Sequence, residues 1–140
     1  MNSHRTLLTL AALALCTPAL AASHEALPSG VVVAHLAQGK GEAPKADNTV
    51  KVHYRGTLTN GTEFDSSYKR KAPISFGLNQ VIPCWTQGVQ RMRVGGKARL
   101  TCPAATAYGA RGVPGVIPPD SVLVFEVELL AIEKPLFGLF

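Results

Sequence analysis

The chain has 140 residues, of which 46% are hydrophobic and 16% charged, and its formal net charge is +5. This length predicts one domain with a single core, and after residue 22 no stretch is apolar enough to span a membrane. The basic side chains are dispersed and lack the interleaved aromatic residues of a nucleic-acid platform, so the charge indicates no nucleic-acid partner.

Residues 1–21 have the pattern of a secretory signal peptide. A single arginine precedes an uncharged apolar stretch, and Ala-Leu-Ala at positions 19–21 is typical of a cleavage site. We expect cleavage after Ala21, with Ala22 as the alternative, and export to the periplasm, with secretion from the cell also open. The other interpretation of the segment is a membrane anchor, for which it is short. Residues 22–29 would then form a polar leader segment.

Export bears on the cysteines. Cys16 would leave with the signal peptide, so the mature chain would keep Cys84 and Cys102. An even count in an oxidising compartment favours a disulfide, and two cysteines without a nearby histidine pair make a poor zinc site. Cys84 also lies directly before the only tryptophan, Trp85. A nucleophile, a metal ligand, half of a disulfide and a small apolar filler therefore all remain open for this thiol.

The next segments predict strands. Residues 31–37 are rich in β-branched side chains, 38–48 have the composition of a loop, and 49–58 alternate between apolar and polar side chains. In the last segment Val50, Val52 and Tyr54 would face the core, while Lys51, His53 and Arg55 would face solvent. Asn-Gly at positions 60–61 predicts a tight turn, after which 62–66 would return as a second strand.

The middle of the chain predicts a charged loop at 67–73, a short strand at 74–76 and one helix. The helix would open at residues 81–83, because proline fits a first helical turn. Trp85, Val89 and Met92 follow at helical spacing, which indicates one buried face. Two glycines at 95–96 would end the helix.

The last third predicts two further strands, 97–102 and 122–130, with Ala98, Leu100 and Cys102 on the apolar side of the first. Between them, 103–120 is rich in glycine and proline and predicts a long loop, a kind of segment that is often functional. The elements together predict an α+β fold in which mostly antiparallel strands surround one short helix.

Motifs of covalent catalysis and of nucleotide, metal or cofactor binding are absent from the sequence. His35 and His53 lie on predicted strands and are expected to be structural, and Asp65 is the one candidate acid, without a partner carboxylate nearby in sequence. By contrast, aromatic and β-branched residues gather at the junctions of loops and strands, where they could line an apolar pocket. They are Tyr54, Phe64, Val81, Ile82, Trp85, Tyr108, Val116, Ile117 and Phe125.

Three blocks of sequence resemble the FKBP-type peptidyl-prolyl cis-trans isomerases, and in particular exported bacterial members. They are VKVHYRGTLTNGTEFDSSYKR, VIPCWTQGVQRMRVGGKARL and AYGARGVPGVIPPDSVLVFEVELL, which occur in the order that the family has. The resemblance places the isomerase domain at 30–133 and a C-terminal tail at 134–140. It implies a half-open antiparallel sheet of five to six strands, wrapped around one short helix. With only about ten residues between the cleavage site and the domain, it also implies a monomer.

The resemblance also implies a pocket. Trp85 would form the floor under a bound proline ring, the backbone N–H of Ile82 and the hydroxyl of Tyr108 would donate to substrate carbonyls, Asp65 would lie at the rim and Ile117 would cap the loop. Departures from the family pattern at Ile74 and Gln80 concern substrate preference, and Cys84 stands where the family usually has glycine. In the family's fold Cys84 would lie near Cys102, which implies a disulfide between them. The walls would be Tyr54, Phe64, Val81, Ile82 and Phe125.

The function implied is a peptidyl-prolyl cis-trans isomerase without cofactor or metal, which assists the folding of exported proteins. Its partners would be unfolded or partly folded polypeptides that contain proline, and its inhibitors would be macrolides. The alternative hypothesis is a periplasmic chaperone module that binds unfolded segments through the same apolar rim and has little isomerase activity. We expect no nucleic-acid partner and no stable membrane insertion.

Overall fold

The computed structural model of the protein describes residues 23–134. The predicted signal peptide therefore lies outside the described residues, as does all of the predicted tail except Lys134. Between residues 23 and 134, no helix is long and apolar enough to cross a membrane. The elements follow one another as β1 (His24–Ala26), β2 (Val32–Ala37), β3 (Thr49–Leu58), β4 (Glu63–Ser66), β5 (Ile74–Gly77), α1 (Pro83–Val89), β6 (Lys97–Cys102), the short 3-10 helix η1 (Ala104–Thr106) and β7 (Leu123–Glu133).

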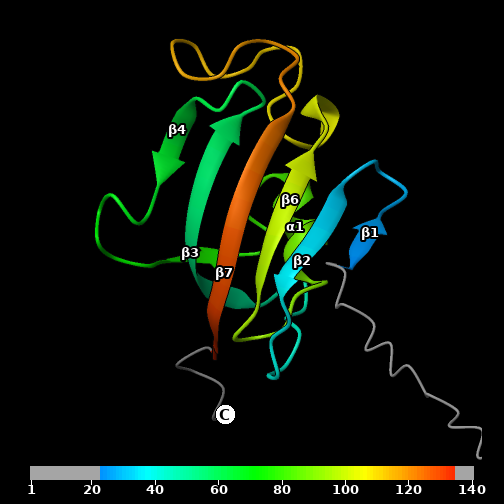
Figure 1. The fold of residues 1–140 in the computed structure, drawn as a ribbon, viewed down its shortest axis with the longest axis vertical. Coiled ribbons are helices and arrows are strands. Elements are labelled where there is room, and N and C mark those ends of the chain that lie inside the picture. The colour runs from blue at the N-terminus through cyan, green and yellow to red at the C-terminus, as the bar shows by residue number, and fades with distance from the viewer. Residues whose placement is uncertain (1–22, 135–140) are drawn as a thin grey trace, which may run out of the picture.

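The strands of this region form one antiparallel sheet in the order β1-β2-β6-β7-β3-β4, and β5 pairs with β3 along the same edge as β4. Figure 1 shows the long β3 and β7 side by side in the middle of the sheet, with α1 behind β6. The predicted class, an open antiparallel sheet with one short helix, is confirmed. The sheet has one strand more than expected, because β1 forms within the predicted leader segment.

The alternation predicted for the central strands is confirmed. On β3, Val50 and Val52 are fully buried and Tyr54 is nearly so, while Lys51 and Arg55 are exposed. The inner side chains of β7 alternate in the same way, since every second residue from Leu123 to Leu129 is buried. One face of the sheet therefore carries the core, and the other face carries charged side chains.

Helix α1 packs on the core face and ends earlier than the pattern predicted. Cys84, Trp85 and Val89 are buried within it, and Met92 is buried in the turn that follows the helix. The close approach of α1 to β6 depends on Gly88, because an added Cβ would lie 2.8 Å from a methyl group of Leu100. The helix is thus held directly against the sheet, with Trp85 in its first turn.

Candidate active site

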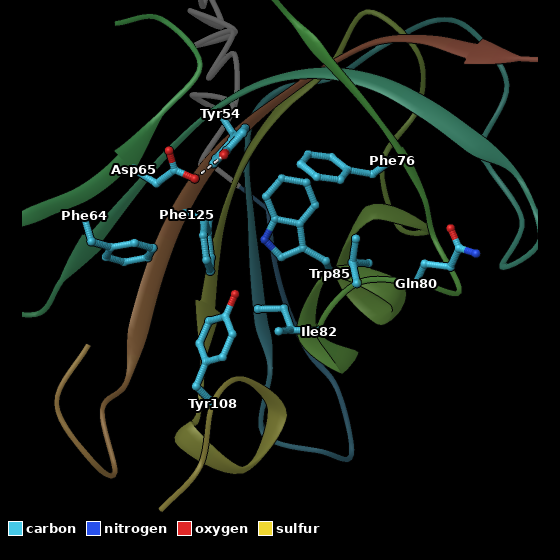
Figure 2. A pocket seen from close by; sticks show the side chains of 10 residues that line it. Tyr54, Phe64, Asp65, Phe76, Gln80, Ile82, Trp85, Tyr108 and Phe125 are labelled. Atoms are coloured by element: carbon cyan, nitrogen blue, oxygen red, sulfur yellow. Dashed lines mark hydrogen bonds between the residues drawn. The ribbon is translucent and has the colours of Figure 1, made fainter. Parts of the chain in front are cut away.

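The core face of the sheet is hollowed into a pocket of about 520 Å³ between α1, the strands and the loop that follows β6. Figure 2 shows aromatic rings from several elements around this space. Most of its surface is apolar, and its polar groups stand at one rim and one side. The pocket is lined by Tyr54, Phe64, Asp65, Phe76, Gln80, Val81, Ile82, Trp85, Tyr108 and Phe125.

Trp85 forms the base of the pocket. Its ring is 4% exposed and meets three other rings edge to face, those of Tyr54 at 5.2 Å, Phe76 at 5.4 Å and Phe125 at 5.4 Å between centroids. This arrangement is favourable, because the positive edge of one ring contacts the negative face of the next. Since α1, β3, β5 and β7 each contribute one ring, the base is fixed by the packing of the whole domain.

A second aromatic pair forms the wall beside Asp65. Phe64 and Phe125 also meet edge to face, with ring centroids 5.5 Å apart. Gly56 of β3 makes room for them, because a Cβ there would lie 2.6 Å from Phe64 and 2.9 Å from Phe125. The glycine at this position is therefore required by the close approach of the two rings.

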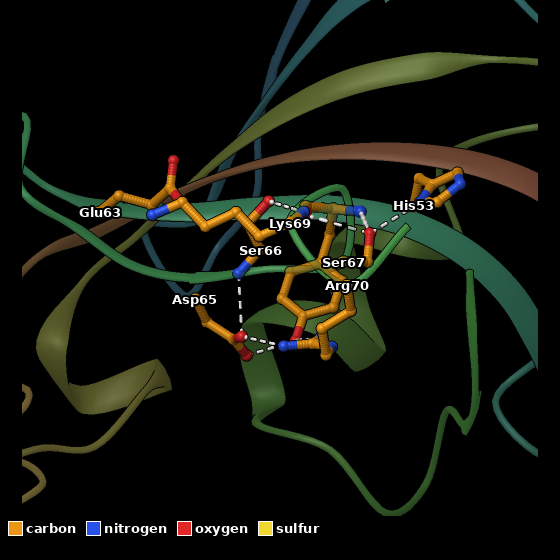
Figure 3. Close-up of polar contacts among 8 residues, drawn as sticks. His53, Glu63, Asp65, Ser66, Ser67, Lys69 and Arg70 are labelled. Atoms are coloured by element: carbon orange, nitrogen blue, oxygen red, sulfur yellow. Dashed lines mark hydrogen bonds and ion pairs between the residues drawn. The ribbon is translucent and has the colours of Figure 1, made fainter. Parts of the chain in front are cut away.

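The polar edge of the pocket is a network of three side chains. The Tyr54 hydroxyl donates to Asp65, and the Arg70 guanidinium donates to Asp65 Oδ1 at 2.7 Å and to the Tyr54 hydroxyl at 3.1 Å. Figure 2 shows the first of these bonds, and Figure 3 shows the contact of Arg70 with Asp65. The carboxylate is thus held by donors from β3 and from the loop after β4.

Electrostatics fixes the protonation of this network. Burial raises the pKa of Tyr54 and the bond to Asp65 raises it further, so the phenol stays neutral and donates. Burial also acts to raise the pKa of Asp65, but hydrogen bonds from Tyr54 and Arg70 outweigh it and hold this pKa below its ordinary value. At neutral pH Asp65 is therefore an anion whose charge is already paired, which makes it a poor general base.

Tyr108 and Ile82 line the opposite side of the pocket. Tyr108 comes from the loop after η1 and is 42% exposed, and Figure 2 shows its hydroxyl directed toward the space between Phe125 and Ile82. Ile82 is the N-cap residue of α1, and its carbonyl accepts from the Trp85 N–H at 2.9 Å. The backbone N–H of Ile82 lies just before the helix, so this corner of the pocket is suited to a ligand carbonyl.

The structure brings together eight of the nine side chains that the sequence assigned to the site. Ile117 is the exception: it does not line the pocket, is 5% exposed, and pairs through its backbone with Val113 inside the loop. Sequence reasoning missed Phe76 and Gln80 as lining residues. The signal for Phe76 was its two-residue spacing from Ile74 on β5, and Gln80 directly precedes Val81.

The two described cysteines lie beside the site but outside the pocket. Cys84 and Cys102 are joined by a disulfide, with their Cα atoms 5.6 Å apart, and both are 0% exposed. The bond connects the first turn of α1 to the end of β6, and η1 and the Tyr108 loop follow directly. Four interpretations were open for Cys84, and in the structure it forms half of a disulfide. Among residues 23–134 no group of three or more His, Cys, Asp or Glu side chains could hold a metal ion.

The sequence matches the model of the family described as FKBP-type peptidyl-prolyl cis-trans isomerase over residues 40–130, more than half of the chain. It is 61% identical over 97 residues to the FKBP-type peptidyl-prolyl cis-trans isomerase FkpA of Aeromonas hydrophila. The matched region is 69% of this chain and 36% of the relative. It is also 52% identical over 103 residues to FK506-binding protein 1 of Dictyostelium discoideum, covering 72% of this chain and 96% of the relative.

Solved structures agree in fold. The crystal structure of FkpA from Escherichia coli matches with a TM-score of 0.76 and 50% identity, covering 79% of this chain and 52% of that one. The crystal structure of AtFKBP13 matches with a TM-score of 0.71 and 38% identity, covering 79% of this chain and 99% of that one. The chain thus spans little more than a third of the bacterial relatives, 36–38%, and nearly all of the Dictyostelium one.

Proposed function

The chain belongs to the family of FKBP-type peptidyl-prolyl cis-trans isomerases, and on that premise we propose that it isomerises X–Pro peptide bonds in polypeptides. The observation that carries the proposal is the aromatic pocket closed at its base by Trp85, which has the size and apolar character to take a prolyl ring. The chemistry needs neither a nucleophile nor a metal, because no bond is broken.

The barrier to this reaction is the loss of amide resonance, about 20 kcal/mol. When the C–N bond is twisted, the amide is less polar than in its planar form. An apolar cavity that excludes water therefore binds the twisted amide better than the planar one, and this difference in binding lowers the barrier. Each ~1.4 kcal/mol of such preference gives a tenfold higher rate. Trp85 and the three rings packed around it provide that environment.

The polar groups would hold the peptide on both sides of the twisting bond. The Tyr108 hydroxyl and the Ile82 N–H are suited to donate to substrate carbonyls, so that the flanking backbone stays fixed while the X–Pro bond twists. The network of Tyr54, Asp65 and Arg70 has a different role, since all three groups are engaged with one another. It gives the polar edge a fixed shape and a paired charge, and it lets the Tyr54 ring contact the substrate.

For substrates and setting we propose unfolded or partly folded polypeptides that contain proline, in the periplasm or outside the cell, with the protein as a monomer. The slow isomerisation of X–Pro bonds limits the folding of chains that are exported unfolded. Two observations support an exported protein: the buried Cys84–Cys102 disulfide, which suits an oxidising compartment, and the similarity to bacterial FkpA. The name of the Dictyostelium relative supports macrolides of the FK506 type as inhibitors.

A peptide assay tests the proposal. A short X–Pro peptide would be followed by NMR exchange with the mature protein, with and without FK506. We expect faster exchange that FK506 abolishes. Val116, in the same loop as Tyr108, is 49% exposed, so binding of unfolded chains without catalysis is the second candidate. No acceleration by a folded protein that still suppresses aggregation of an unfolded client would overturn the isomerase proposal in favour of a chaperone.

A further inference from the structure

The edge of β3 that carries β4 and β5 has a gap at Tyr54. β4 pairs with residues 55–57 and β5 with residues 49–52, so neither strand reaches positions 53 and 54. Ser67, just after β4, fills the gap. Its backbone N–H donates to the Tyr54 carbonyl at 3.0 Å, and its hydroxyl accepts the Tyr54 N–H at 2.8 Å. The amide of a pocket residue is therefore satisfied by one side chain.

The Ser67 hydroxyl is in turn oriented by His53. Ser67 is 0% exposed, and its Oγ lies 2.8 Å from His53 Nδ1 and 3.3 Å from the Tyr54 carbonyl. Figure 3 shows Ser67 between His53 and the β3 backbone. A hydroxyl has one hydrogen to donate, and the shorter contact is to His53, while the Tyr54 carbonyl already accepts the Ser67 N–H. We therefore assign the hydroxyl hydrogen to the bond with His53 Nδ1, which places the ring proton on Nε2.

The imidazole itself is fixed on the outer face of the sheet. It stacks on the Tyr68 ring with centroids 4.6 Å apart and planes 13° apart. The Tyr68 hydroxyl donates to Glu128 Oε2 at 3.1 Å. Burial, together with Glu128, raises the pKa of Tyr68 to about 12, so the phenol remains protonated and keeps this bond. The position of the His53 ring is therefore fixed by its place on β3 and by the stacked Tyr68 ring.

We propose that His53 and Ser67 are positioning residues for Tyr54. His53 orients the Ser67 hydroxyl, the hydroxyl fixes the Tyr54 amide, and the amide fixes a ring that packs on Trp85 and donates to Asp65. The catalytic consequence rests on the proposed isomerase function, whereas the effect on the Tyr54 backbone and ring does not. A side chain on the outer face thereby sets the geometry of the pocket on the other face.

The test compares His53→Asn with His53→Gln. Both variants replace the ring by a neutral amide, but the Asn amide lies near the place of Nδ1 and the Gln amide near that of Nε2. We expect His53→Asn to keep the wild-type kcat and KM. His53→Gln should lower kcat about tenfold with little change in KM. The reason is that a displaced Tyr54 ring weakens binding of the twisted amide more than binding of the planar substrate. The assay follows the cis–trans exchange of a short X–Pro peptide in the presence of the full mature protein.

Two structural readouts accompany the kinetics. Trp85 is the only tryptophan, so its emission reports the packing of Tyr54 against it, and NMR reports the hydrogen exchange of the Tyr54 amide. Both should change in His53→Gln, with exchange about tenfold faster, and both should stay as in wild type in His53→Asn. Ser75→Ala is the control, because Ser75 lies on β5 and its hydroxyl donates to Glu133, at 2.7 Å.

Each outcome is decisive. Unchanged Tyr54 exchange and Trp85 emission in His53→Gln would overturn the proposal, as would equal impairment of both variants, since the ring and not Nδ1 would then matter. Ser67→Ala should resemble His53→Gln or be more severe, and if it does not fold, the His53 pair still decides. A wild type without isomerase activity would remove the proposed function, but the exchange and emission readouts would still accept or reject the positioning role.

Discussion

The base and the rim of the pocket are built in different ways. The base consists of rings on strands and helix, of which Trp85, Tyr54 and Phe125 are at most 5% exposed. The rim opposite them is a loop whose side chains Tyr108 and Val116 are 42% and 49% exposed. Both regions would touch a substrate, yet Trp85, Tyr54 and Phe125 belong to the hydrophobic core, whereas Tyr108 and Val116 do not.

The rim keeps its shape through its backbone. Gly109, Gly112 and Gly115 have φ angles of 57°, 61° and 76°, which favour glycine. At Gly112 an added Cβ would also lie 2.3 Å from the Ile117 carbonyl oxygen, so the loop closes tightly on itself. The comparison indicates a division of roles: side chains of the base contribute stability and pocket shape, while side chains of the rim are free to serve the substrate.

The largest effect should follow from removing the base. We expect Trp85→Ala to lower the free energy of unfolding by about 3–5 kcal/mol, because it leaves a large cavity among three rings. Tyr108→Ala is the matched control from the rim and should change it by no more than about 0.5 kcal/mol. Urea denaturation of both variants measures the difference. Similar losses in the two variants would show that the division between base and rim is wrong.

The disulfide should have the next largest effect. It closes a loop with a sequence separation of 18 between the helix of the base and the strand that leads to the rim. By the loop-entropy model, the double variant Cys84→Ala/Cys102→Ala should lose about 3 kcal/mol of stability. Denaturation with and without reductant measures this, and reduced wild type should approach the variant. Two free thiols in the oxidised mature protein would contradict the bond.

The sequence predicted the base better than the details around it. Alternation on β3 and β7 predicted which side chains face inward, because a half-buried sheet imposes a period of two. Proline before Cys84 and Trp85 likewise predicted the beginning of the helix. The assignment of most lining residues, however, depended on the family resemblance, since a pattern of burial does not distinguish a core ring from a pocket ring.

Tertiary contacts account for what was missed. β1 has three residues, too few for an alternating pattern to indicate a strand, and it exists because its backbone pairs with β2. Phe76 reaches the pocket because β5 returns along the edge of β3 beyond β4. Ile117 is turned inward by its backbone pairing with Val113. Ser67 follows a strand in a polar run, and only the gap in the pairing of β3 gives its hydroxyl a role.

A single oxygen of the rim offers a sharper test. Tyr108→Phe removes the hydroxyl and keeps the ring, so we expect the stability to stay within about 0.5 kcal/mol of wild type. The kcat/KM for peptide exchange should nevertheless fall about tenfold, as expected when a donor to a substrate carbonyl is lost. An unchanged kcat/KM would mean that the rim shapes the pocket without donating to the substrate.

The smallest effect should come from Asp65, which connects the two regions at the polar edge. Its pKa lies below the ordinary 3.8 in the folded protein, so the ionised carboxylate favours folding above that pH. This contribution is lost as the pH falls through the folded-state pKa. The pair with Arg70 is half exposed, with side chains 50% and 39% accessible, and we expect at most about 1 kcal/mol.

Asp65→Asn isolates this contribution, because the other carboxylates with lowered pKa values, Glu63 and Glu126, remain in both proteins. Urea denaturation should find wild type more stable than the variant near pH 7, with the gap closing as the pH falls below 3.8. A gap that persisted in acid would trace the effect to hydrogen bonding and not to charge. In that case the Tyr54 hydroxyl, which donates to Asp65, would stabilise the edge through a hydrogen bond that a neutral amide accepts less well, and Asp65 would belong to the base and not to the rim.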